Sequence, residues 1–212
     1  MTTQKRGTRA LGAAVITLVA CVVFTFTFIR SVAYSPEAEI PLPTSLTSAV
    51  SNQVRINDTD RFGAMGLPTR LIIPDLNIDA EVQKVGIAKS GNMTPPSHFS
   101  DVGWYKYGTV PGEVGSAVMA GHVDNALGLA GVFKYLGDLN TGQDIYVSTD
   151  KGEKLHFKVA DIASYDYTNV PTETIFNQAD APRLRLITCG GSWIQSAKSY
   201  DKRVVVTALL LK

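Results

Sequence analysis

The residue best suited to covalent chemistry is Cys189, which follows the apolar run 184–188 and precedes Gly190 and Gly191. The other cysteine, Cys21, lies in a long apolar segment near the N-terminus, so Cys189 has no partner thiol within its own domain. In an oxidising compartment, such a thiol is buried, joined to another chain or used chemically. Gly190 and Gly191 have no side chains to cover the sulfur, which favours a chemical role for Cys189.

A cysteine nucleophile needs an acid–base partner, and histidine is the usual choice. His122 follows the stretch 115–121, which has the pattern of a buried strand and ends in a glycine. Catalytic groups often lie at such strand ends, although a histidine there is more often structural when it stands alone. His156 lies in an alternating stretch that predicts a solvated side chain, and His98 lies in a proline-containing loop. His122 is therefore the preferred partner.

Arg203 is the third candidate, at the start of the apolar run 204–211. A guanidinium at this position either extends to solvent or faces a site that needs a fixed charge and a fork of donors. Asp124, two residues after His122, either orients the imidazole or is solvated. The sequence leaves both pairs of alternatives open.

The N-terminal part of the chain predicts export. Residues 11–29 carry no charge and, as a helix, would be about 28 Å long, close to the hydrocarbon thickness of a bilayer. Lys5, Arg6 and Arg9 precede this segment, so the positive-inside rule predicts a cytoplasmic tail (1–10), a single transmembrane helix (11–30) and an extracellular linker (31–67). A cleaved signal peptide, with a small-residue site at 31–33, is the alternative.

The residues after position 30 carry a net charge of about −3 and no basic stripe, which argues against a nucleic-acid partner. No carboxylate cluster has the spacing of a calcium loop, and we expect no metal or cofactor. No resolving cysteine accompanies Cys189, so a redox role is disfavoured.

Short β-type runs separated by turn residues dominate the region from residue 70 onward. Strands are expected at 71–73, 81–85, 116–120, 144–147, 154–164, 183–188 and 203–211, with a hairpin turn at 150–152. Short helical turns are expected at 132–139 and 171–176. Seven or eight short strands predict a mainly β domain, either a closed barrel or a sandwich.

Three elements together resemble a known family. The stretch 121–124 (Gly-His-Val-Asp), the stretch 185–189 (Arg-Leu-Ile-Thr-Cys) and Arg203 resemble the signature elements of sortases, the membrane-anchored cysteine transpeptidases of Gram-positive bacteria. The family's Thr-Leu-x-Thr-Cys signature has Arg185 in place of its first threonine. The stretch 103–105 (Gly-Trp-Tyr) and the Thr-Cys-Gly-Gly ending most resemble class F, with class E second.

This resemblance implies a closed eight-stranded barrel with one or two short helices, in which the histidine ends the fourth strand, the cysteine ends the seventh and the arginine lies on the eighth. It implies that His122, Cys189 and Arg203 are catalytic. The donor would be a Leu-Pro-x-Thr-Gly sorting signal, and the acceptor a peptidoglycan amine. The protein would lie in the cell membrane as a single-pass protein with its catalytic domain outside.

The loop 161–182 leads into the cysteine strand, so we expect it to form a wall of the substrate groove, with Val170 and Pro171 as substrate-binding residues. The alternative is a lid on the domain's own core. Thr188 could contribute a backbone or hydroxyl donor, or be an ordinary strand residue. Two other functions remain open: a cysteine peptidase that releases its product to water, and a non-catalytic membrane-anchored barrel that binds cell-wall peptides.

Overall fold

The computed structural model describes residue 19, residues 39–46 and residues 65–211. The expected cytoplasmic tail and nearly all of the expected anchor therefore lie outside the described residues, as does most of the linker. Within the described ranges, no helix is both long enough and apolar enough to cross a membrane.

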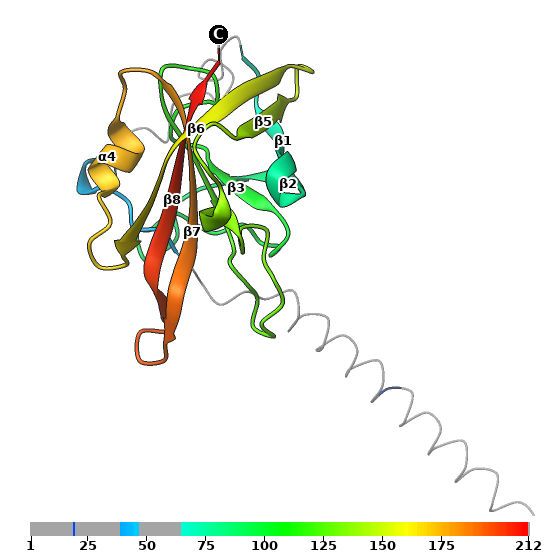
Figure 1. The fold of residues 1–212 in the computed structure, drawn as a ribbon. Helices are drawn as coiled ribbons and strands as arrows, with labels where there is room; N and C mark the ends of the chain where they lie inside the picture. The colour runs from blue at the N-terminus through cyan, green and yellow to red at the C-terminus, as the bar shows by residue number, and fades with distance from the viewer. Residues whose placement is uncertain (1–18, 20–38, 47–64, 212) are drawn as a thin grey trace, which may run out of the picture.

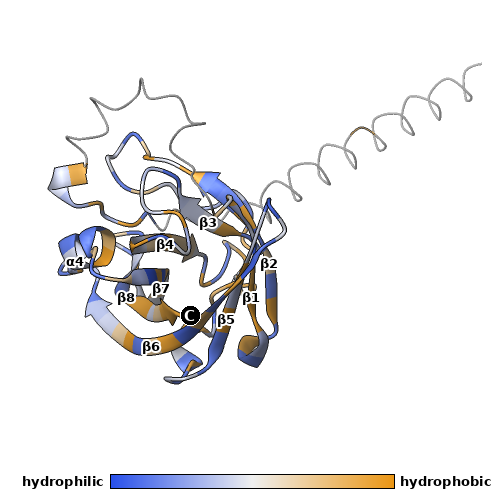
Figure 2. Cartoon of the chain, turned by 90° about the horizontal axis from the view of Figure 1, so that it is seen from above, coloured by the Kyte–Doolittle hydropathy of each residue, from blue (hydrophilic) through white to orange (hydrophobic). Residues whose placement is uncertain are grey.

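Eight strands close into one barrel in the order β1-β2-β3-β4-β7-β8-β6-β5 (Figures 1 and 2). Neighbouring strands are antiparallel except for two parallel pairs, β2 with β3 and β4 with β7. The closed barrel is confirmed over the sandwich. Its strands are β1 (Pro68–Ile73), β2 (Ile78–Val85), β3 (Val102–Tyr105), β4 (Gly115–Gly121), β5 (Asp144–Thr149), β6 (Lys154–Asp166), β7 (Pro182–Ile194) and β8 (Ser199–Leu210).

Within residues 65–211, the structure has three short helices: the 3-10 helices η1 (Pro74–Leu76) and η2 (Leu136–Asp138), and the α-helix α4 (Thr172–Asn177). The last two confirm the helical turns expected at 132–139 and 171–176. The turn expected at 150–152 joins β5 and β6, which pair as an antiparallel hairpin.

The strand predictions were wrong in three respects. Strand β3 was not predicted, because it has four residues that are all buried and show no alternation. Strands β7 and β8 extend beyond the predicted runs as a long hairpin, so Cys189 lies within β7 and Arg203 within β8 instead of at their ends. Strand β6 continues to Asp166, so the β6–β7 connection is shorter than the expected loop 161–182.

The barrel interior is one apolar cluster to which every strand contributes. Successive residues of a strand point to opposite faces, so Leu184 and Leu186 of β7 face inward together with Trp104 of β3 and Phe157 of β6. All four side chains are fully buried.

A second apolar cluster covers the outer face of β4, β7 and β8 beneath α4, which we call the outer cluster. Because β4 is covered on both faces, all of its residues are buried, which explains why its sequence is a continuous apolar run. Its members are Ile40, Val85, Met93, Tyr105, Val118, Ala120, Ile175, Phe176, Ile187 and Val205. Three of them, Ala120, Ile187 and Val205, lead directly to the candidate catalytic residues.

Candidate active site

Cys189 and Arg203 lie directly opposite each other on the β7–β8 hairpin. The register pairs Cys189 with Arg203 and, two residues earlier on β7, Ile187 with Val205. Because side chains alternate along a strand, Cys189 shares its face with Ile187, which belongs to the outer cluster. The sulfur therefore lies at one end of the outer apolar face, not inside the barrel.

His122 reaches the same place from β4. The parallel register pairs Ala120 with Ile187, and His122 and Cys189 each follow two residues later. Gly121, which ends β4, is required here, because a Cβ atom at this position would lie 2.5 Å from the ring of Phe133. The amide of Phe133 also donates a hydrogen bond of 2.9 Å to the carbonyl of His122. Close packing against Phe133 thus fixes the backbone that carries the imidazole.

The imidazole of His122 is buried, with 3% of the residue exposed. Its Nε2 lies 2.9 Å from the carbonyl oxygen of Pro96, to which it donates, so Nδ1 is the free acceptor of the neutral ring. Burial lowers the pKa of His122 below its ordinary value, against the opposing effects of the Pro96 carbonyl and the Asp124 carboxylate. The resting imidazole is therefore neutral at pH 7.

Asp124 is fixed by a hydroxyl group. Tyr200 of β8 donates a hydrogen bond to the Asp124 carboxylate. The negative charge of Asp124 raises the pKa of both His122 and Cys189 by electrostatic interaction across space. Asp124 is thus a carboxylate that is held by Tyr200 and favours the protonated forms of both groups. An orienting role toward the imidazole stays a prediction.

The thiol of Cys189 is buried as well, with 3% of the residue exposed. Burial raises the pKa of Cys189 to about 11, and the nearby charge of Arg203 opposes this rise. Desolvation disfavours the thiolate more than the single guanidinium stabilises it. The resting nucleophile is a neutral thiol.

The guanidinium of Arg203 is held by backbone and hydroxyl oxygens. Its Nη1 donates to the carbonyl oxygens of Tyr200 and Lys202 at 3.0 and 2.9 Å, and its Nη2 donates to Ser199 Oγ at 2.9 Å. Among the described residues, no carboxylate forms an ion pair with Arg203, and its buried Nε has no hydrogen-bond partner. A buried N–H without a partner, beside a candidate nucleophile, can donate a hydrogen bond to an oxygen on which negative charge develops.

The predicted substrate-binding residues lie at different places. Thr188 is buried in β7 on the face opposite Cys189, and its hydroxyl has no partner among the described residues. The hydroxyl therefore points away from the nucleophile, and only the Thr188 backbone remains a predicted contact. Val170 packs against the outer cluster, and Pro171 precedes α4. Both lie beside the outer face, so a role in substrate binding stays a prediction.

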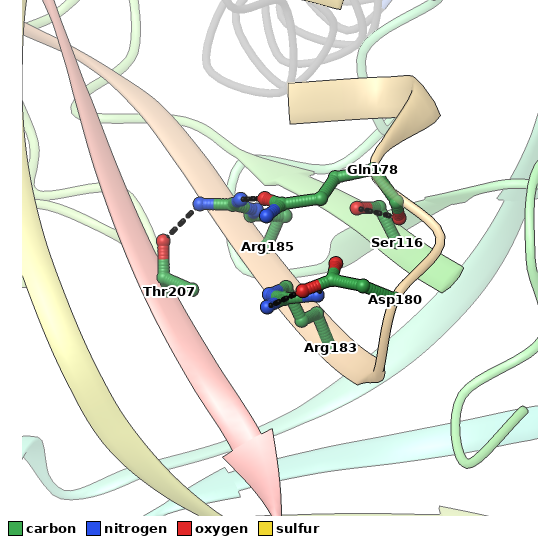
Figure 3. Close-up of polar contacts among 6 residues, drawn as sticks. All are labelled: Ser116, Gln178, Asp180, Arg183, Arg185 and Thr207. Atoms are coloured by element: carbon green, nitrogen blue, oxygen red, sulfur yellow. Dashed lines mark hydrogen bonds and ion pairs between the residues drawn. The ribbon is translucent and has the colours of Figure 1, made fainter. Parts of the chain in front are cut away.

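Arg185, which replaces a signature threonine, connects the β6–β7 segment to the barrel (Figure 3). Its guanidinium donates to the hydroxyl of Thr207 on β8 and, at 2.6 Å, to Oε1 of Gln178, just after α4. The hydroxyl of Ser116 on β4 donates to the Gln178 carbonyl at 3.1 Å, and Arg183 forms an ion pair with Asp180. These contacts hold the C-terminal side of α4 over the outer face.

Sequence reasoning missed two partners of the site. Pro96, which accepts from His122, and Tyr200, which binds Asp124, are brought in by folding from distant loops and strands, and no local pattern marks them. His98 is exposed, as expected, whereas His156 is half-buried and lies 2.6 Å from Asp144. Across residues 39–46 and 65–211, no cluster of three or more His, Cys, Asp or Glu side chains could hold a metal ion.

Comparison with known proteins identifies the architecture. A family model described as "Sortase domain" matches residues 71–211. Sortase C-1 from Actinomyces oris is similar at 20% identity, covering 84% of this chain and 87% of its own, with a TM-score of 0.55. Sortase A from Corynebacterium diphtheriae is similar at 17% identity, covering 88% and 80%, with a TM-score of 0.55. At these identities the solved structures show the shared fold alone. None of the curated proteins compared matches the chain.

Proposed function

We propose that this chain, which belongs to the sortase family, is a cysteine transpeptidase that cleaves a sorting signal through a thioester on Cys189 and transfers the acyl group to a cell-wall amine. Family membership supports a cell-wall transpeptidase. The observation that carries the assignment of residues is the meeting of His122, Cys189 and Arg203 at one end of the outer face, with the Arg203 Nε unpartnered.

In the proposed reaction, Cys189 Sγ attacks the scissile carbonyl carbon and forms a carbon–sulfur bond. Arg203 donates to the developing oxyanion. When the tetrahedral intermediate collapses, the carbon–nitrogen bond breaks and His122 protonates the departing amine. The acceptor amine then attacks the thioester, His122 takes its proton, and the thiolate leaves. The peptide bond is exchanged without a net redox change.

The reactive ionisation state is rare before substrate arrives. Because burial raises the pKa of Cys189 to about 11 and lowers the pKa of His122, the thiolate–imidazolium pair is the minor form before substrate binds. Transfer of the thiol proton to His122 therefore accompanies substrate binding or attack. The charge of Arg203 favours this transfer, because it stabilises the thiolate.

The sequence resemblance supports finer proposals. The donor is a Leu-Pro-x-Thr-Gly-type signal cut after the threonine, and the acceptor is an amine of the peptidoglycan cross-bridge or stem peptide. We assign the chain to class F, with class E second. A transmembrane helix at 11–30 would hold the domain on the outer surface of the cell membrane, with residues 1–10 in the cytoplasm.

Peptide transfer tests this proposal. The full chain incubated with a Leu-Pro-x-Thr-Gly peptide and an amine is expected to yield a threonyl-amine product by mass spectrometry. Cys189→Ala should abolish the product and leave thermal stability nearly unchanged. His156→Ala, on β6, is the matched histidine control and should retain activity. Transfer by Cys189→Ala would remove the sulfur from the mechanism.

The partition between amine and water separates the transpeptidase from a cysteine peptidase, since both pass through the same thioester. A product formed only with water, at every amine concentration, would favour the peptidase. The non-catalytic alternative predicts an ordinary exposed thiol that is alkylated with a pKa near 8.5. The burial of Cys189 argues against it.

A further inference from the structure

A short segment of the expected linker lies against the barrel. We call residues 39–46 the strap; in Figure 1 it is the blue segment beside α4. Ile40 is 3% exposed and forms an antiparallel bridge with Met93, whose amide donates to the Ile40 carbonyl at 2.8 Å. The carboxylate of Glu39 accepts hydrogen bonds from the Ser90 hydroxyl and, at 3.0 Å, from the Asn92 side chain.

The other end of the strap is bound to α4. The hydroxyl of Ser45 donates to the Glu173 carboxylate at 3.1 Å, and the Asn177 side chain donates to Ser45 Oγ at 3.1 Å. Ser45 lies within a helical turn, in which the Leu46 amide donates to the Pro43 carbonyl at 3.0 Å. The strap is therefore attached both to the 90–93 loop and to α4, on the two sides of the outer cluster.

Between these attachments the strap packs against the outer cluster, which extends to the neighbours of the candidate catalytic residues. Ile40 is a member of the outer cluster, and Leu42 and Leu46 pack against it. Ala120, Ile187 and Val205 belong to the same cluster and lie two residues from His122, Cys189 and Arg203 along β4, β7 and β8. Val170, the expected wall residue, packs on this cluster too.

The strap also has the chemistry of the proposed donor. Leu42-Pro43 are the first two residues of a Leu-Pro-x-Thr-Gly signal, and Ser45 stands where that signal has threonine. Ser45, however, is held by Glu173 and Asn177 on α4 and is exposed. The strap thus places its Leu-Pro pair beside the outer cluster. Ser45, which corresponds to the threonine after which the signal is cut, is bound to α4 instead.

We propose that residues 39–46 are an intramolecular mimic of the sorting signal that occupies the Leu-Pro part of the substrate groove and must be displaced before a donor peptide binds. This inference rests on the proposed function, because the mimicry is defined by the donor. A peptide that binds only the strap-free state has an apparent Kd raised by the inverse of the strap-free fraction.

The side-chain attachments of the strap are weaker than its apolar contact. Its side-chain hydrogen bonds through Glu39 and Ser45 lie at or near the surface, where each contributes little net stability. The buried contact of Ile40 with Met93 is the part that must be broken when the strap is displaced. Binding of the strap gains from being intramolecular, because the local concentration of a tethered segment reaches the millimolar range. A donor peptide with additional contacts to the catalytic residues can therefore displace it.

Full-chain variants with a charge on the strap test the proposal. Ile40→Asp and Leu42→Asp should release it, since a carboxylate is expensive to bury in an apolar cluster. We expect kcat/KM for a Leu-Pro-x-Thr-Gly peptide to rise about tenfold through KM, with kcat unchanged, as for a strap that is closed about nine-tenths of the time. Leu211→Asp, an exposed leucine at the far end of the chain, is the matched control. Rates equal to this control would overturn the proposal.

A second measurement does not depend on turnover. In a Cys21→Ser, Cys189→Ala background, Ile40→Cys with Met93→Cys should form a cross-link between the bridge partners under mild oxidation, detected by mass spectrometry. The cross-linked chain should bind a fluorescent Leu-Pro-x-Thr-Gly peptide at least about tenfold more weakly than the same chain after reduction. Equal affinity of the two forms would disprove occupancy of the groove by the strap.

The two measurements separate the failure of this inference from that of the proposed function. If no variant transfers peptide but reduction of the cross-link restores peptide binding, the strap covers a peptide-binding groove that is not catalytic. If transfer is normal and neither the Asp variants nor the cross-link alters peptide affinity, the enzyme stands and the strap proposal fails.

Discussion

The two faces of strands β4, β7 and β8 each carry a buried apolar cluster, yet the two clusters are covered by different kinds of structure. Every strand of the barrel contributes to the inner face, including Leu186 of β7. Helix α4 and residues 39–46 pack on the outer face, in the cluster that includes Ile187. The side-chain hydrogen bonds of residues 39–46 to α4 lie at the surface, whereas those of Gln178, just after α4, are part-buried. Uncovering the inner face requires unfolding, whereas a displaced segment uncovers the outer one. Burial alone therefore does not separate a stabilising residue from a substrate-binding residue.

Substitution of two adjacent residues tests this difference most directly. Leu186→Ala should lower the free energy of unfolding by about 2–5 kcal/mol, because the closed barrel cannot collapse around the cavity. Ile187→Ala should lower it less, because its cover can adjust, but should reduce kcat/KM about tenfold or more through lost contact with the donor peptide. Denaturant unfolding and peptide-transfer kinetics measure the two effects. Equal destabilisation with unchanged KM in both variants would remove the distinction between the faces.

Arg203→Lys examines the catalytic end of the outer face. The variant keeps a positive charge but loses the fork of donors, including the unpartnered Nε. We expect kcat to fall by about 10²–10³ in single-turnover transfer assays, with the free energy of unfolding little changed. Arg183→Lys, on the same face but paired with Asp180, is the control and should be nearly fully active. A near-normal kcat for Arg203→Lys would make this arginine structural.

The pH dependence of kcat/KM reports the ionisation of the buried pair. Activity needs a protonated His122 and an ionised Cys189, so the profile should be flat between the two pKa values and fall on either side. The acid limb should lie below pH 6.5, because burial lowers the His122 pKa, and the alkaline limb should lie near pH 11. His156→Ala should leave both limbs in place. A fall already complete by pH 9 would mean that the thiol is not desolvated as described.

The smallest effect is expected at Thr188, whose hydroxyl lies on the inner face without a partner among the described residues. Thr188→Val removes a buried unsatisfied group and keeps the shape, so the free energy of unfolding should stay the same or rise by up to about 1 kcal/mol. Transfer activity should be unchanged, because the backbone at this position is retained. A large loss of kcat would instead place the hydroxyl at the oxyanion.

The strands that bring the candidate site residues together could largely be predicted, because they have strong local patterns. The apolar runs before His122 and Cys189 and after Arg203 exist because their strands are covered on both faces, and the three residue types indicate one chemistry. Strand β3 is too short to show a period, and the face of Thr188 depends on where β7 begins. The contact of Ile40 with Met93 joins residues 53 positions apart, and a segment in which only Ile40 and Pro43 are buried shows no periodic pattern in the sequence.

The cross-strand pairing of Cys189 with Arg203 divides the proposed catalytic residues into two groups that can move separately. Bending or twisting of the β7–β8 hairpin carries the sulfur and its cationic neighbour together, so their mutual geometry survives such motion. The imidazole of His122 follows β4, a separate strand, and donates a hydrogen bond to the Pro96 carbonyl. Changes in the loop around Pro96 can therefore retune proton delivery while the nucleophile and its charge stabiliser stay as they are.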